Sequence, residues 1–152
     1  MARPEKIRLG DLLVRQNVIT DEQLKLALDE QKRSGRKLGR VLVESGYATE
    51  EGISKALARQ LGAEYIDLKA FLPRPELVKL LPEAQARRFR ALALDEQQGM
   101  LRVGMSDPTD LAAFDEIARI VKRDIDLVVV TESQLLPLLD RVYRRTEEIS
   151  NL

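Results

Sequence analysis

The chain has 152 residues, enough for one domain or two small ones, and its 44% apolar and 33% charged residues are typical of a folded globular protein. Its 25 Lys and Arg balance 25 Asp and Glu, so it lacks the basic excess of a double-stranded DNA-binding protein and DNA is not an expected partner. It has no Cys or His, which excludes disulfides, thiolate metal sites and imidazole catalysis. No apolar run is long enough for a membrane span or a signal-peptide core, so we expect a cytoplasmic protein.

Most of the first sixty residues consists of one unit written twice. Residues 8–31 and 37–60 align with an offset of 29 and are identical at nine of 24 positions. A five-residue spacer, residues 32–36, joins them. In each copy, apolar residues at helical spacing predict a short helix, a turn and a longer helix.

Matching residues in the two copies mark the turns and the helix ends. Asn17 and Gly46 can adopt the left-handed conformation that ends the short helix. Thr20 and Thr49 are suited to cap the longer helix, and acidic residues follow them. The residues that share one face of the longer helices are Leu24, Leu28 and Gln31 in the first copy and Ile53, Leu57 and Gln60 in the second.

Beyond Gly62, strand-like and helix-like stretches alternate, which predicts a small α/β half. The strand candidates are a short stretch at 64–68 and longer ones at 91–94, 101–105 and 126–130, with 91–94 and 101–105 forming a hairpin around the polar loop 95–99. Helices are expected from Pro73 and Pro75 to Leu81, within 82–89, and after the segment 107–110.

The last predicted helix has a distinct start and end. Thr131 and Gln134 have the spacing of a capping box, and the helix is expected to end near Tyr143. Pro137 lies about six residues into this helix, so a kink or a late start is expected. The polar tail, residues 144–152, is expected to fray.

These patterns together predict a mixed α+β fold. Residues 1–62 are expected to form a ligand-binding subdomain, an N-terminal helical bundle of two duplicated helix-turn-helix units. Residues 63–146 are expected to form a small α/β subdomain of about three strands, and residues 147–152 to begin a linker.

The chain shows no catalytic motif. Neither phosphate-cradling loop, G-x-x-x-x-G-K-[ST] or G-x-G-x-x-G, is present, and no carboxylate pair indicates acid–base catalysis. We therefore expect a chain that is not an enzyme, with no catalytic residue, metal site or cofactor.

The duplicated unit carries the functional signal instead. Arg8 and Lys37 each precede a Leu-Gly pair, and an arginine can fork hydrogen bonds onto a phosphate and stack on a base. Gln31 and Gln60 can read a purine edge, because an amide both donates and accepts. Two copies would suit a ligand with two bases and two phosphates. The alternative, from periodicity alone, is a helical repeat that only packs on itself.

The doubled R-L-G…L…L-x-x-Q pattern with its five-residue spacer resembles a known family. It is similar to the MshE-type N-terminal domain, a regulatory domain of type II secretion and type IV pilus assembly ATPases that binds the second messenger cyclic di-GMP. The segments LLPEAQARRFRAL, LRVGMSDPTDL and RVYRRTEEI are also typical of these domains. The resemblance implies a regulatory domain attached to a C-terminal ATPase domain of the same polypeptide.

The resemblance also implies which residues contact the ligand. Arg8 would stack on a guanine and bind phosphate, and Gln31 would read the guanine edge. The full implied set is Arg8, Leu9, Gly10, Leu24, Leu28 and Gln31 in the first copy and Lys37, Leu38, Gly39, Ile53, Leu57 and Gln60 in the second. Asp107 matches a further position of the site, with helix capping before Leu111 as the alternative.

Three departures from the family pattern lie in these copies. Lys37 replaces an arginine, which weakens stacking and forked phosphate contact in the second copy. Asn17 replaces a common glycine, and Ile53 replaces a leucine, both with small consequences.

The resemblance finally implies a location and a rival function. It suggests a cytoplasmic domain at the inner-membrane face of a secretion or pilus machine. The rival is an adaptor that docks the ATPase on an inner-membrane platform protein without any nucleotide ligand.

Overall fold

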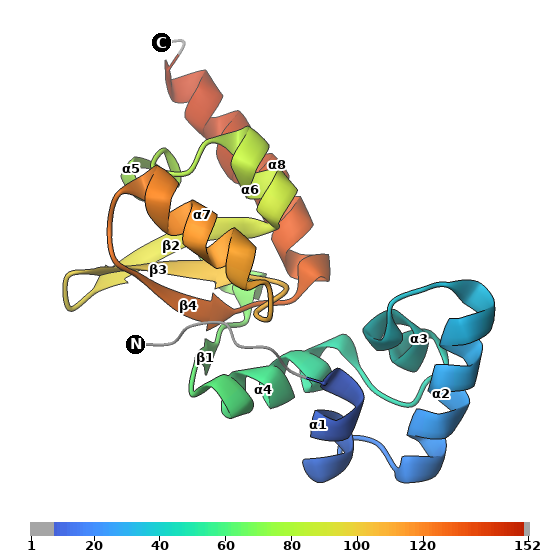
Figure 1. Cartoon of the computed structure of the whole chain (residues 1–152). Helices are drawn as coiled ribbons and strands as arrows, with labels where there is room; N and C mark the ends of the chain where they lie inside the picture. The colour runs from blue at the N-terminus through green and yellow to red at the C-terminus, as the bar shows by residue number, and fades with distance from the viewer. Residues whose placement is uncertain (1–7, 151–152) are drawn as a thin grey trace.

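The structure, a computed structural model, describes residues 8–150, with side chains as far as residue 144. It consists of a helical half and an α/β half that lie next to each other (Figure 1). The helical half contains α1 (Leu9–Arg15), α2 (Asp21–Ser34), α3 (Leu38–Glu44) and α4 (Glu50–Leu61). The pairs α1–α2 and α3–α4 correspond to the two copies, so the predicted short and long helix in each copy is confirmed.

The predicted turn and cap residues are also confirmed. Asn17 and Gly46 have φ of 61° and 78°, the left-handed conformation that follows a short helix. The Thr20 hydroxyl accepts a hydrogen bond from the Gln23 N–H (3.1 Å), and the Gln23 side chain accepts one from the Thr20 N–H (3.0 Å), which forms a capping box. Thr49 caps α4 through a 3.0 Å hydrogen bond from the backbone three residues on.

The two copies interlock rather than pack as separate hairpins. α1 packs mainly on α4, and α3 packs mainly on α2. Leu12 and Leu13 in the first copy, and their equivalents Val41 and Leu42 in the second, are at most 3% exposed. Because seven-residue helices are not stable alone in water, this shared core is what holds α1 and α3 in place.

A four-stranded sheet forms the centre of the other half. Its strands β1 (Glu64–Tyr65), β2 (Ala91–Gln97), β3 (Met100–Met105) and β4 (Ile125–Val129) are ordered β1-β4-β3-β2. β2 and β3 form the predicted antiparallel hairpin, while β3–β4 and β1–β4 are parallel. All four strands arise at the predicted strand candidates, and the short candidate at 64–68 forms only the two-residue β1.

The hairpin loop is shorter than the sequence predicted. The strands continue through most of the polar stretch, and only Gln98 and Gly99 lie between them, with φ of 54° and 78°. Such a two-residue turn with two positive φ values matches the twist of the adjoining strands. The expected five-residue loop was therefore wrong, because strand pairing extended over polar residues.

Helices pack around this sheet and close a second core, separate from that of the helical half. The elements between β1 and β2 are the 3-10 turn η1 (Leu68–Ala70), α5 (Pro75–Val78) and α6 (Glu83–Phe89). α7 (Leu111–Val121) joins β3 to β4 and buries Phe114, Ile117 and Val121. α8 (Glu132–Ser150) lies beside α6, where Arg87 and Asp140 pair at 2.8 Å (Figure 1).

α8 begins directly after Thr131, as predicted, but extends beyond its predicted end. The helix begins at Glu132, so Pro137 causes no late start, and it continues to Ser150 rather than ending near Tyr143. The fraying expected from residue 144 was wrong as far as residue 150, because no glycine or proline interrupts the polar segment. Residues 151–152 lie outside the described residues. The linker at 147–152 and the boundary at residue 62 stay predictions.

The capping box predicted for Thr131 and Gln134 is not formed. The Gln134 side chain instead accepts a hydrogen bond from the Leu68 N–H (3.0 Å) and donates one to Asp67 (2.8 Å). The Thr131 hydroxyl has no hydrogen-bond partner among the described residues. A long-range contact to η1 thus replaced the local one. Within residues 8–150, no helix is both long and apolar enough to cross a membrane.

Candidate functional site

The structure brings together the Leu-Gly pairs at the heads of the two copies. A Cβ on Gly10 would lie 3.3 Å from Cδ2 of Leu38 and only 2.5 Å from Cδ1 of Leu24. A Cβ on Gly39 would lie 3.6 Å from Cδ2 of Leu9. Each Leu-Gly pair therefore contacts the other, and the starts of α1 and α3 meet.

Gly10 has a packing role that the sequence did not indicate. The resemblance implied a ligand contact for this glycine, and the structure buries it inside α1 against two leucine side chains. Gly39 makes only an ordinary contact and is half-buried. The two equivalent glycines are thus under different steric demands. No motif within one copy could reveal this, because Leu38 belongs to the other copy.

Arg8 and Lys37 occupy the residue immediately before α1 and α3. Both have extended backbones, with φ/ψ of −86°/102° and −64°/144°, and neither side chain caps its helix. Both are exposed, and neither side chain takes part in a hydrogen bond or ion pair with another residue in the described range 8–150, although both backbone carbonyls accept the first hydrogen bond of their helix. Two long cations are therefore available to a ligand at the place where the copies meet.

The two apolar stripes differ in what they expose. On α2, Leu24 and Gln31 are half-buried and Leu28 is 39% exposed. On α4, Ile53 and Leu57 are buried in the helical core at 8% and 7% exposure, while Gln60 is exposed. The first copy consequently offers more apolar surface to a ligand than the second copy does.

Asp107 does not cap α7. Its Oδ1 accepts hydrogen bonds from the Thr109 N–H (3.1 Å) and the Thr109 hydroxyl (2.6 Å), which holds the turn before the helix. The cap is Asp110, which accepts from the Ala113 N–H at 3.0 Å. The capping alternative for Asp107 was therefore wrong by one turn. Asp107 is exposed and makes no hydrogen bond to Arg8 in the described part of the chain, so its ligand role stays a prediction.

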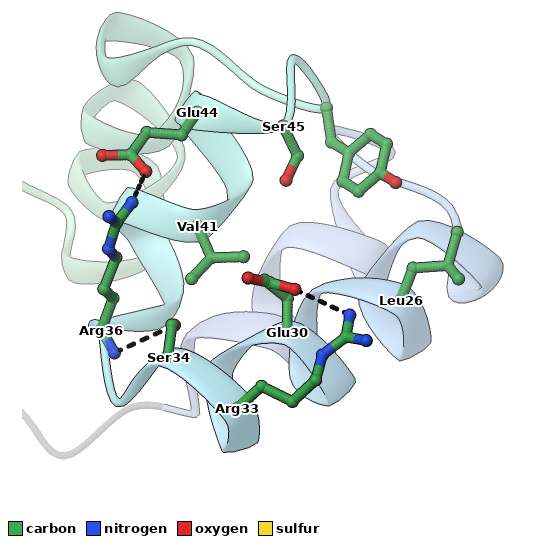
Figure 2. Close-up of a pocket in the computed structure, with 9 residues that line it drawn as sticks. Leu26, Glu30, Arg33, Ser34, Arg36, Val41, Glu44 and Ser45 are labelled. Carbon is green, nitrogen blue, oxygen red and sulfur yellow. Dashed lines mark hydrogen bonds and ion pairs between the residues drawn. The ribbon is translucent and has the colours of Figure 1, made fainter.

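A hollow of about 270 Å³ lies between α2 and α3 (Figure 2), and none of the expected ligand residues lines it. Its lining residues are Leu26, Glu30, Arg33, Ser34, Arg36, Val41, Glu44, Ser45 and Tyr47. Ion pairs already use its charges: Arg33 binds Glu30 (2.7 Å), and Arg36 and Arg40 bind Glu44. The hydrogen bond from Arg40 lowers the pKa of Glu44.

The repeat itself explains why this hollow exists. In the equivalent place between α1 and α4, Gln16 donates a hydrogen bond to the Ala56 carbonyl (3.1 Å) and accepts one from Arg59 (2.8 Å). Ser45 occupies the position of Gln16 in the other copy and is too short to make this bridge. The hollow is thus a place where the second copy lacks a filling side chain.

Comparisons with known proteins agree with this architecture. Residues 61–149 match the model of the MshEN domain family. The type IV pilus assembly ATPase PilB of Myxococcus xanthus is 33% identical over 136 residues, 90% of this chain and 24% of the relative. PilB of Thermus thermophilus is 32% identical over 182 aligned positions, covering 96% and 20%. Bacteriophage adsorption protein B of Escherichia coli is 30% identical over 137 residues, covering 90% and 18%.

Two solved structures share the fold. A structure of MshE with cdg (cyclic di-GMP) has a TM-score of 0.80 and 39% identity, and the match covers 91% of this chain and 100% of that one. The N-terminal domain of XpsE has a TM-score of 0.70 at 22% identity over 88% and 92% of the chains, which shows the fold alone. This chain spans about a quarter or less of the length of the curated relatives it matches. It belongs to the MshEN domain family and corresponds to the N-terminal region of type IV pilus and type II secretion ATPases.

Proposed function

We propose that this chain is a regulatory domain that binds cyclic di-GMP through its two motif copies and controls an attached type II secretion or type IV pilus ATPase. One observation carries the proposal. The chain is 39% identical over 91% of its length to MshE, whose structure holds this ligand. The meeting of the two motif heads at Gly10 and Leu38 supports the same proposal.

The chemistry of the two heads suits a ligand with two guanines and two phosphates. Arg8 can stack on one base and fork hydrogen bonds onto a phosphate, and Lys37 can supply a point charge to the other. Leu24 and Leu28 offer an apolar wall beside Gln31, which can pair with a guanine edge. The first copy forms the stronger half-site, since its cation is an arginine and its Leu28 is exposed.

Ligand binding to this chain would regulate an ATPase domain in the rest of the polypeptide. The curated relatives are about four to six times longer than the segment they share with this chain, and several are named as ATPases. No phosphate loop lies in these 152 residues, so nucleotide hydrolysis would belong to the attached domain. The domain would act on the cytoplasmic side of a secretion or pilus machine, next to its inner-membrane platform protein.

Isothermal titration calorimetry on this chain tests the proposal. We expect saturable heat with cyclic di-GMP, much weaker binding of GTP, and loss of at least about tenfold in affinity in Arg8→Ala, since one forked, stacked contact to a charged group is worth about 1.5–3 kcal/mol. Arg15→Ala is the matched control, an exposed arginine at the opposite end of α1. No heat at tens of micromolar ligand, or equal losses in both variants, would overturn the proposal and favour docking without a nucleotide.

A further inference from the structure

Gln16, the residue that ends α1, ties this helix to α4. Its side-chain amide donates to the Ala56 carbonyl (3.1 Å) and accepts from the Arg59 guanidinium (2.8 Å), partners 40 and 43 residues away in the sequence. The amide group therefore bonds through both its nitrogen and its oxygen. In the described part of the chain, no other side chain of α1 hydrogen-bonds to another helix.

The other end of α1 carries the cation of the first copy. The Leu12 N–H donates to the Arg8 carbonyl (3.1 Å), and the Gln16 N–H donates to the Leu12 carbonyl (3.0 Å). One column of backbone hydrogen bonds thus joins Arg8 to Gln16, and a helix of this length spans about 12 Å. α1 is a short arm with the cation at one end and the bridge to α4 at the other.

α4 carries an expected ligand residue next to the bridge. Arg59 directly precedes Gln60, and Ala56 lies one helical turn before Gln60. Both partners of Gln16 therefore belong to the last turns of α4. The bridge connects the helix that follows Arg8 to the turn that carries Gln60.

Packing alone would let α1 shift on α4. Leu12 and Leu13 are fully buried in the helical core, but apolar contacts have little directional preference. Hydrogen bonds require a narrow range of distances and angles, so the bridge fixes how α1 is rotated and where it lies along α4. A seven-residue helix has little stability of its own to resist such a shift.

The second copy has no such bridge. Ser45 occupies the position of Gln16, and the hollow between α2 and α3 lies beside it (Figure 2). The equivalent of Arg59 is Glu30, which pairs with Arg33 of its own helix (2.7 Å). Among the described residues, no side chain of α3 hydrogen-bonds to α2. α3 is therefore less firmly oriented on α2 than α1 is on α4.

We propose that Gln16 is a positioning residue of the ligand site, a role that rests on the proposed binding of cyclic di-GMP. Without contacting the ligand, it holds Arg8 in a fixed place relative to Gln60, so less freedom is lost on binding. Lys37 and Gln31, the equivalent pair on α3 and α2, lack this constraint. The missing bridge is thus a second reason, beside the lysine itself, why the Lys37 half-site is the weaker one.

Three single variants test this role by calorimetry with cyclic di-GMP. Gln16→Ala should weaken binding about three- to tenfold, at a temperature where circular dichroism shows the variant to be folded. Arg59→Ala removes one of the two hydrogen bonds and should weaken binding by a smaller factor. Ser45→Ala is the matched control at the equivalent position, and its affinity should equal that of the wild type.

A double-mutant cycle separates positioning from a general structural effect. In an Arg8→Ala background, Gln16→Ala should weaken binding by less than about twofold, because the positioned cation is gone. In a Lys37→Ala background it should keep its full effect. A general loss of structure would weaken binding by the same factor in both backgrounds.

Hydrogen exchange without any ligand tests the bridge itself. Gln16→Ala should speed exchange of the Leu12 amide, which donates to the Arg8 carbonyl, by at least about fivefold. The equivalent Val41 amide, which donates to the Lys37 carbonyl, should be unaffected.

Four outcomes would overturn the positioning role. They are wild-type affinity in Gln16→Ala, an equal loss in Ser45→Ala, equal factors in the two backgrounds, and unchanged exchange at Leu12. Absence of binding by the wild type would overturn the proposed nucleotide function and the positioning role together, so the two failures are distinguishable.

Discussion

Leu38, at the start of the second copy, packs against Gly10, at the start of the first. A Cβ on Gly10 would lie 3.3 Å from Cδ2 of Leu38 and 2.5 Å from Cδ1 of Leu24, so any larger residue forces a neighbour to move. The equivalent contact at Gly39 is relaxed, at 3.6 Å from Leu9. The contact at Gly10 ties the first copy to the second at the place where both cations stand.

Gly10→Ala therefore tests whether this contact is tight. We expect the clash to displace the end of the Leu24 side chain and to offset the gain of about 1 kcal/mol that alanine brings inside a helix, so the variant should be neutral or destabilised by up to about 2 kcal/mol. Gly39→Ala, the matched control, should be neutral or stabilise by up to about 1 kcal/mol, because alanine favours a helix and the site has room. Urea unfolding at constant pH measures both, and equal midpoints for the two variants would contradict the packing.

Lys37→Arg should strengthen the weaker half-site. An arginine there can stack on a base and bind a phosphate at two points, and a gain of about 0.5–1.4 kcal/mol corresponds to roughly two- to tenfold tighter binding of cyclic di-GMP. Arg8→Lys should loosen binding by a similar factor. Lys32→Arg, in the exposed spacer, is the control, because it adds a guanidinium group outside the expected ligand site. Calorimetry showing no difference between Lys37→Arg and Lys32→Arg would count against the two-half-site interpretation.

Arg102, on the inner strand β3, forms ion pairs with the two outer strands of the sheet. Its side chain is 5% exposed, 2.8 Å from Glu64 on β1 and 2.9 Å from Asp95 on β2, although the Asp95 contact lies off the line of a good hydrogen bond. Arg102→Ala should cost about 3–5 kcal/mol in the free energy of unfolding, because it leaves Asp95 partly buried without its cation. Glu64→Gln, which changes an exposed partner, should cost about 1 kcal/mol or less. Similar unfolding midpoints for both variants would contradict this role.

The burial of Tyr143 predicts that the free energy of unfolding decreases at alkaline pH. Its hydroxyl donates to the Leu81 carbonyl (2.7 Å) and is buried, and burial raises the pKa of this phenol well above its ordinary value. The folded-state pKa is the higher one, so the neutral phenol stabilises the fold fully below a pH of about 10 and this stabilisation is lost as the pH rises above that value.

Tyr143→Phe should make that dependence shallower. At neutral pH the variant loses one hydrogen bond, about 1 kcal/mol, but its urea midpoint should fall less than that of the wild type between about pH 9 and 11. Tyr47→Phe controls for the removal of a phenol elsewhere. Parallel pH profiles for Tyr143→Phe and the wild type would show that Tyr143 does not carry the effect.

Local signals predicted much of the fold, and the failures share a cause. Asn17, Thr20 and Thr49 fulfil their expected roles because a turn or a cap depends on three or four neighbouring residues. Gln134 was misassigned because its actual partners, Asp67 and the Leu68 N–H, are more than sixty residues away. Nothing near Gln134 in the sequence distinguishes the two choices.

The candidate site divides in the same way. The repeat located Arg8 and Lys37, and helical spacing placed Leu24, Leu28 and Gln31 on one face. The sequence pattern could not show that Leu28 is exposed whereas its equivalent Leu57 is buried, because that difference arises from what packs against each helix. The steric demand on Gly10 was hidden for the same reason.

α4 is buried by both halves of the molecule. Ile53, Ala56 and Leu57 face the helical core, while Leu61 packs on the core of the α/β half. Its copy α2 buries only Ala27 and keeps much of its surface open to solvent. After a duplication, one helix of such a pair can drift in sequence and adjust to a new effector, whereas the other is constrained by two neighbours at once. Engineering of altered ligand preference in this domain should therefore begin on α2.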